Sequence, residues 1–116
     1  MQRDFDIESV WRGDALYLEV EGELDLATAP TLDEALIRAE ASTAALVVID
    51  LTGASFIDST GLRTLLEAHL RSEADGNRLR ITGASDQAQR LFRLAGLLDR
   101  LPLLLPTDAA GASGPD

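Results

Sequence analysis

The stretch SFIDSTGL at residues 55–62 separates two segments of contrasting character. Before it, residues 45–49 form a continuous apolar run that ends at Asp50, which is typical of a central strand buried on both faces. After it, leucines recur at positions 62, 65, 66 and 70, the spacing of a helix with one buried face. The sequence therefore predicts a buried strand, a connection rich in side-chain oxygens, and then a helix.

Asp58, Ser59 and Thr60 supply more side-chain oxygens than the start of a helix requires. The first backbone N–H groups of a helix have no acceptor within the helix, and a side-chain oxygen that accepts one contributes about 1 kcal/mol. The simplest structural interpretation is an N-cap, with Gly61 letting the first turn pack closely. Asp58 and Thr60 are the favoured caps, and the choice between them is open at this point.

A nucleophilic role for Ser59 would require a nearby base, usually histidine or lysine. The only histidine, His69, lies in the same predicted helix, roughly 13–15 Å along the axis at about 1.5 Å per residue. The chain contains no lysine. We therefore predict that the protein is not an enzyme, that it has no catalytic residues, and that His69 is a partly exposed helix residue.

Asp50, at the end of the buried strand, raises a second possibility, a phospho-accepting aspartate that binds Mg²⁺, as in response-regulator receiver domains. Those domains also carry an acidic pair after the first strand and a lysine late in the chain. This sequence has neither feature. We therefore predict no metal site and no cofactor.

A third interpretation makes Ser59 the substrate of another protein. A hydroxyl at an exposed helix N-terminus is accessible to a kinase, and a phosphate there would carry about −1.5 to −2 charges beside the positive end of the helix. The helix need not unfold on modification. A partner that docks on the uncharged serine would instead meet charge and bulk, which is a local electrostatic switch.

Working outward from this stretch, further strands and helices can be predicted. The hydrophobic alternation and turn residues indicate strands at 5–11, 15–21, 45–49 and 79–82, an edge strand or an apolar tail segment at 101–105, and helices from about 32, 62 and 88. Thr28 or Thr31 could cap the first helix, and Thr31 has capping-box spacing to Glu34. This β-β-α-β-α-β-α-(β) order predicts an α/β domain with a partly parallel sheet.

Composition limits the class of protein further. The 116 residues suffice for one domain, and the net charge of −10 with no basic cluster argues against direct binding of nucleic acid. The absence of cysteine excludes disulfides and thiolate sites. No signal peptide or membrane-spanning run is present, so a cytoplasmic protein that does not bind a membrane is expected. Residues 106–116, which are rich in small residues, proline and glycine, are expected to be disordered.

Four segments together resemble the STAS domain family, with the closest likeness to bacterial anti-sigma-factor antagonists: GELDLATAP, ALVVIDL, FIDSTGL and LRITGAS…RLFRLAGLLDRL. The resemblance extends from about Phe5 to Leu105. It implies a single STAS domain at residues 1–105, with a four- to five-stranded mixed sheet and helices packed mainly on one side. It also implies a protein that is not an enzyme.

The resemblance further implies a function. The unphosphorylated protein would bind an anti-sigma factor, which then releases its sigma factor. That anti-sigma factor would itself be a Ser/Thr kinase that inactivates the antagonist by phosphorylating Ser59, and a PP2C-type phosphatase would reverse the modification. The partner-binding residues would be Asp25, Phe56, Asp58, Ser59, Thr60 and Gly61.

Two points stay open at this stage. Asp25 could orient the nucleotide–metal site of the kinase, or it could only cap the first helix. The alternative function is that of a STAS scaffold subunit in a stressosome-like or lipid-transport complex. In either case a monomer or a weak dimer is expected.

Overall fold

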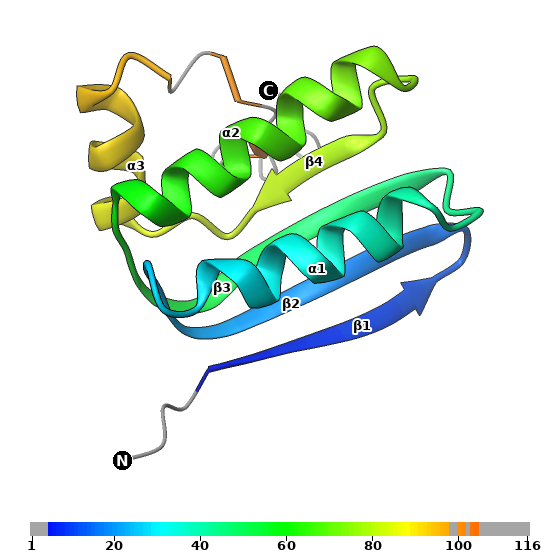
Figure 1. The fold of residues 1–116 in the computed structure, drawn as a ribbon, viewed down its shortest axis with the longest axis horizontal. Coiled ribbons are helices and arrows are strands. Elements are labelled where there is room, and N and C mark those ends of the chain that lie inside the picture. The colour runs from blue at the N-terminus through cyan, green and yellow to red at the C-terminus, as the bar shows by residue number, and fades with distance from the viewer. Residues whose placement is uncertain (1–4, 98–99, 102, 105–116) are drawn as a thin grey trace, which may run out of the picture.

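The computed structural model of the chain describes residues 5–97, 100–101 and 103–104. A five-stranded sheet of order β1-β2-β3-β4-β5 lies behind the helices (Figure 1). Its first two strands are antiparallel, and every later neighbouring pair is parallel, so the sheet is mixed. Along the chain the elements are β1 (Asp6–Arg12), β2 (Ala15–Leu24), α1 (Ala29–Glu40), β3 (Leu46–Ile57), α2 (Ser59–Ala74), β4 (Leu79–Thr82), α3 (Asp86–Leu94) and β5 (Leu103–Leu104).

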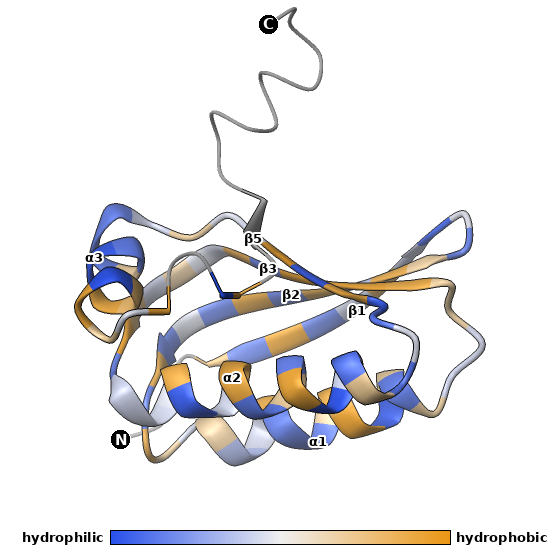
Figure 2. Cartoon of the chain, turned by 90° about the horizontal axis from the view of Figure 1, so that it is seen from above, coloured by the Kyte–Doolittle hydropathy of each residue, from blue (hydrophilic) through white to orange (hydrophobic). Residues whose placement is uncertain are grey.

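This order confirms the predicted α/β class and the mixed sheet of four to five strands. Helices α1 and α2 lie side by side on one face of the sheet, and α3 lies near the N-terminal end of α2 (Figures 1 and 2). The leucines at 32 and 36 in α1 and at 65 in α2 are fully buried against the strands. The apolar stripe of α2 differs from the prediction at one end, because Leu70 is exposed while Ala68 and His69 are buried.

Two strands run further than the sequence predicts. The prediction ended β2 at residue 21 and β3 at residue 49, whereas the strands reach Leu24 and Ile57 and pair with each other there. The pairing shifts register twice within β2, and at one shift Gly53 lies opposite Glu21. A Cβ on Gly53 would lie 2.9 Å from the backbone oxygen of Val20, so only glycine allows this close approach. Because the pairing is irregular here, buried and exposed side chains do not alternate regularly. The sequence therefore lacks the pattern that would have predicted the last residues of β2 and β3.

The start of α1 also differs in detail from the prediction. Thr28 is the N-cap residue, but its side chain makes no capping bond to the helix. Its hydroxyl donates to the backbone oxygen of Glu23 at 2.7 Å instead. Thr31 lies inside the helix, so it does not cap and the expected capping box with Glu34 is wrong.

Near the C-terminus, β5 is described at Leu103–Leu104, within the segment predicted as an edge strand at 101–105. The tail at 106–116, for which disorder was expected, lies outside the described residues, and so does the exact end of the domain predicted at residue 105. Among the residues that the structure does describe, no helix is both long and apolar enough to cross a membrane.

Candidate functional site

The ends of β2 and β3 bring two of the predicted site residues to the same edge of the sheet. Leu24 pairs with Ile57 at the last position of both strands. The backbone N–H of Asp58 then donates to the backbone oxygen of Leu24 at 3.1 Å. Asp25 and Asp58 therefore leave neighbouring strand ends together, which places the loop before α1 beside the first turn of α2.

Asp58 is the residue that caps α2. Its backbone is extended, with φ −102° and ψ −174°, and its Oδ1 accepts a hydrogen bond from the backbone N–H of Gly61 at 2.9 Å. Thr60 contributes only its backbone oxygen, which accepts from the hydroxyl of Thr64 at 3.2 Å. The choice that the sequence left open between Asp58 and Thr60 is thus decided for Asp58.

Ser59 is the first residue of α2 and is exposed. Among the side-chain hydrogen bonds between described residues, none involves the Ser59 hydroxyl, because Asp58 already provides the cap. The hydroxyl thus lies at the positive end of a 16-residue helix and is open to an approaching protein.

Gly61 fixes how closely α2 approaches the end of β2. It is buried, and a Cβ added to it would lie 2.8 Å from both Cγ and the backbone oxygen of Leu24. The same Cβ would lie 3.1 Å from Cγ2 of Ile57. The first turn of α2 can therefore pack against both strand ends only if residue 61 is glycine.

Asp25 organises the loop between β2 and α1. Its Oδ1 accepts from the backbone N–H groups of Ala27 and Thr28 at 3.0 and 3.2 Å. This is the behaviour of an aspartate in an Asx turn, and it stabilises the chain just before the helix. The Asp25 side chain therefore orders the turn that precedes α1, and the nucleotide–metal role left open for it stays a prediction.

Two large apolar side chains are exposed around this edge. Phe56, the last residue but one of β3, is 43% exposed, which suits the predicted contact with a partner. Leu26, next to Asp25, is 74% exposed, and the sequence analysis did not single it out. A leucine in a polar loop gives no periodic signal, so only its exposure in the fold identifies it.

Gln87 of α3 is a second residue that sequence reasoning missed. Its side-chain amide donates to the backbone oxygen of Ile57 at 2.9 Å, and its Oε1 accepts from the backbone N–H of Ile57 at 3.1 Å. Strand β4 pairs with β3 only as far as Asp50 and Thr82. Gln87 therefore occupies the place of a missing strand partner and holds the residue that precedes Asp58.

The side chains at this edge do not form a catalytic set. His69 lies two to three turns further along α2 and is buried, contrary to the expectation of partial exposure, with its Nε2 3.3 Å from Glu73. Within the described part of the chain, no group of three or more histidine or carboxylate side chains is placed to hold a metal ion. The geometry instead leaves the Ser59 hydroxyl and the Phe56 ring exposed beside the capping carboxylate of Asp58.

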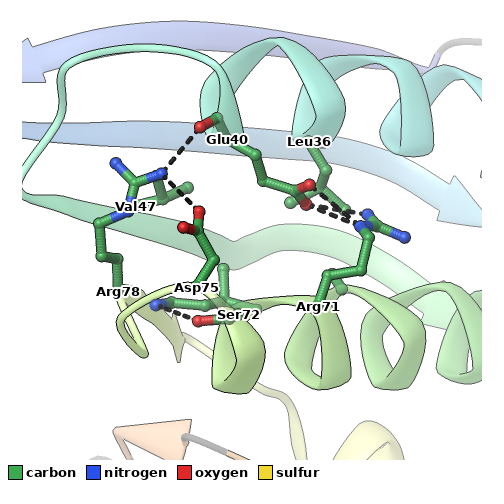
Figure 3. A pocket seen from close by; sticks show the side chains of 9 residues that line it. Leu36, Glu40, Val47, Arg71, Ser72, Asp75 and Arg78 are labelled. Atoms are coloured by element: carbon green, nitrogen blue, oxygen red, sulfur yellow. Dashed lines mark hydrogen bonds and ion pairs between the residues drawn. The ribbon is translucent and has the colours of Figure 1, made fainter.

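A hollow of about 150 Å³ lies at the opposite end of α2 (Figure 3). Arg71 and Glu40 point toward one another there, and Nε and Nη2 of Arg71 donate to the carboxylate at 2.9–3.1 Å. The hydrogen bond with Glu40 raises the pKa of Arg71 above its ordinary value. Arg78 donates to the backbone oxygen of Glu40 at 2.8 Å and to Asp75 at 3.3 Å. These bonds connect the C-terminal ends of α1 and α2.

Comparison with known proteins places this geometry in context. The STAS domain family model matches residues 6–110. The chain is 37% identical to the anti-sigma-B factor antagonist of Listeria monocytogenes over 86 residues, which are 74% of this chain and 75% of the relative. It is 32% identical to the protein of the same name from Staphylococcus epidermidis over 96 residues, which are 83% of this chain and 89% of the relative.

A solved structure agrees with these sequence relatives. The crystal structure of an anti-sigma factor antagonist from Mycobacterium paratuberculosis superposes with a TM-score of 0.80 and 25% sequence identity, covering 97% of this chain and 96% of that one. All three relatives are named for a regulatory role, and none is named for an enzymatic activity.

Proposed function

The chain belongs to the STAS domain family, and we propose that it is an anti-sigma-factor antagonist whose activity is switched by phosphorylation of Ser59. The unphosphorylated protein binds an anti-sigma factor in the cytoplasm, and the sigma factor is thereby released. The anti-sigma factor is also the Ser/Thr kinase that modifies Ser59, and a PP2C-type phosphatase restores the active form. The antagonist acts as a monomer or weak dimer.

The observation that carries this proposal is that Asp58 caps α2 and Ser59 does not. Asp58 alone provides the side-chain cap of α2, while the Ser59 hydroxyl is exposed and takes no part in capping. A phosphate on Ser59 would therefore break no hydrogen bond on which the fold depends. The positive helix end would tolerate the phosphate, whereas a partner seated on the neutral serine would meet new charge and bulk.

The proposed contact surface surrounds Ser59. Phe56 offers an exposed ring, and Thr60 is partly exposed beside the serine. Asp25 and Asp58 hold the two loops in place through their bonds to backbone N–H groups, and Gly61 sets the depth of the helix against the sheet. The partner would thus meet a preformed surface, and binding would require little ordering of the chain.

Intact-mass measurement after incubation with ATP, Mg²⁺ and the purified kinase-type anti-sigma factor from the same genome tests the proposal. One phosphate should be added to the wild type and none to Ser59→Ala. Ser55→Ala is a matched control, since Ser55 is also an exposed serine but lies within β3, and it should be modified like the wild type. Phosphate on Ser59→Ala would refute the site. Copurification with a membrane transport complex, without binding to any such kinase, would favour the scaffold alternative.

A further inference from the structure

A groove between the N-terminal halves of α1 and α2 opens next to the proposed switch. Leu26, Ala29 and Pro30 line it on the side of α1, and Thr60 and Thr64 line it on the side of α2. Its volume is about 260 Å³, and it is open to solvent. We call it the α1–α2 groove. Because Thr60 follows Ser59 directly, a partner that covers the serine also reaches this groove.

Two carboxylates complete the α1–α2 groove, Asp33 from α1 and Glu67 from α2. No arginine is among the residues that line it. Asp33 is 3.5 Å from Nη2 of Arg71, and Glu67 is 3.5 Å from Nε of Arg63. The carboxylate side chains are 42% and 55% exposed, and ion pairs that long and that exposed contribute little free energy.

The pairing of Asp33 is loose for a structural reason. The hydrogen bonds of Arg71 go to Glu40, so the buried Oδ1 of Asp33 faces Arg71 at 3.5 Å without a hydrogen bond. The α1–α2 groove therefore combines an apolar wall, formed by Leu26 and Pro30, with two carboxylate side chains that are partly exposed. An arginine or lysine side chain has the complementary form, an apolar stem with a cationic head.

We propose that the α1–α2 groove receives a basic side chain, arginine or lysine, from the anti-sigma factor. The stem lies against Leu26 and Pro30, and the cationic head is bound by Asp33 and Glu67 through charge-assisted hydrogen bonds. The identity of the partner rests on the proposed function, whereas the chemistry of the site rests on the groove itself. The net charge of −10 adds long-range attraction to such a basic segment.

A pair of charge reversals on one helix tests this site. Glu67 and Glu73 both lie on α2, and their side chains are 55% and 56% exposed, but only Glu67 lines the groove. Glu67→Lys should weaken binding of the anti-sigma factor about tenfold at low salt, with a smaller loss at high salt. Glu73→Lys, which changes the net charge equally, should alter affinity by less than about twofold. Equal losses in the two variants would overturn the proposal.

A second pair of variants tests the apolar wall of the α1–α2 groove. Leu26 and Leu94 are 74% and 87% exposed, so replacing either with serine should leave thermal unfolding nearly unchanged. Leu26→Ser should weaken binding about three- to tenfold, whereas Leu94→Ser on α3 should not. If Leu26→Ser binds like the wild type, the stem contact is wrong.

A test without the anti-sigma factor separates this inference from the proposed function. Amide NMR spectra of the ¹⁵N-labelled protein are followed during titration with the peptide acetyl-Arg-Leu-Arg-amide and, as a control, its glutamine counterpart. The arginine peptide should shift the amide signals of Thr60, Thr64 and Glu67 and should lose this effect on Glu67→Lys. Identical shifts with the two peptides would overturn the groove proposal even if Ser59 is phosphorylated. Selective shifts would support it even if no kinase-type partner binds.

Discussion

The two ends of α2 are built for different tasks. At its C-terminal end, Arg71 and Arg78 form hydrogen bonds with α1 and with Asp75, and the hydroxyl of Ser72 accepts from the backbone N–H of Leu79 at 3.0 Å. At its N-terminal end, the hydroxyl of Ser59 is exposed. The comparison teaches that the polar bonds between α1 and the C-terminal part of α2 gather at one end, so the other end can present groups to a partner.

This contrast can be tested first at Gly61, because the N-terminal end of α2 keeps its position through the close packing of this residue. Gly61→Ala should lower the free energy of unfolding by about 2 kcal/mol net, because the clash with Leu24 outweighs the gain in helix propensity of about 1 kcal/mol. Urea denaturation measures the change. An unchanged midpoint would show that the strand end moves easily and that the surface beside Ser59 is not rigid.

Removing the arginine at the opposite end should lower stability without weakening recognition, because Arg71 pairs with Asp33 of the α1–α2 groove but does not line that groove. Arg71→Met keeps the apolar stem but removes the two-pronged bond to Glu40, and it should cost about 1 kcal/mol, since the arginine side chain is 38% exposed. Kinase-dependent phosphorylation of Ser59 should not become slower. A lower rate at full stability would mean that the two ends are energetically coupled.

At the N-terminal end of α2, loss of the Asp58 cap should change the free energy of unfolding by a similar amount. Asp58→Ala removes the acceptor for the N–H of Gly61 and should cost about 1 kcal/mol, while Asp58→Asn, which keeps an acceptor oxygen, should cost only a few tenths. Thermal unfolding of both variants distinguishes the loss of the cap from the loss of charge. Equal destabilisation of the two variants would contradict a cap based on hydrogen bonding.

The smallest expected effect on stability is at Gln87. Gln87→Met should cost about 0.5–1 kcal/mol, but it should raise the hydrogen-exchange rate of the Ile57 amide much more than that of other β3 amides. Because Ile57 precedes the cap, binding of the anti-sigma factor should also weaken. Unchanged exchange at Ile57 would show that Gln87 does not hold the strand end.

The sequence predicted the parts of this fold that depend on regular spacing. The leucines of α1 and α2 and the apolar run of β3 each indicated the correct element, because burial of one face follows the period of the helix or strand. The ends of β2 and β3 could not be predicted, because the register shifts near Gly53 are set by pairing with a distant strand. The element order and the mixed sheet followed from the predicted segments.

At the candidate site, the sequence narrowed the cap to a few oxygens but could not choose among them, since the choice depends on the backbone angles of Asp58. The contact of Gln87 with Ile57 joins residues 30 positions apart, so no local pattern indicates it. The α1–α2 groove arises only when two helices pack together, and for the same reason its carboxylates look like ordinary surface residues in the sequence.

The affinity of the anti-sigma factor for the unmodified and the Ser59-phosphorylated protein tests the central claim most directly. Isothermal titration calorimetry with each form, prepared from one batch and checked by intact mass, provides the comparison. The unmodified protein should bind, and the phosphorylated protein should bind at least about a hundredfold more weakly, a difference of roughly 2.7 kcal/mol. Equal affinity of the two forms would contradict the switch at Ser59.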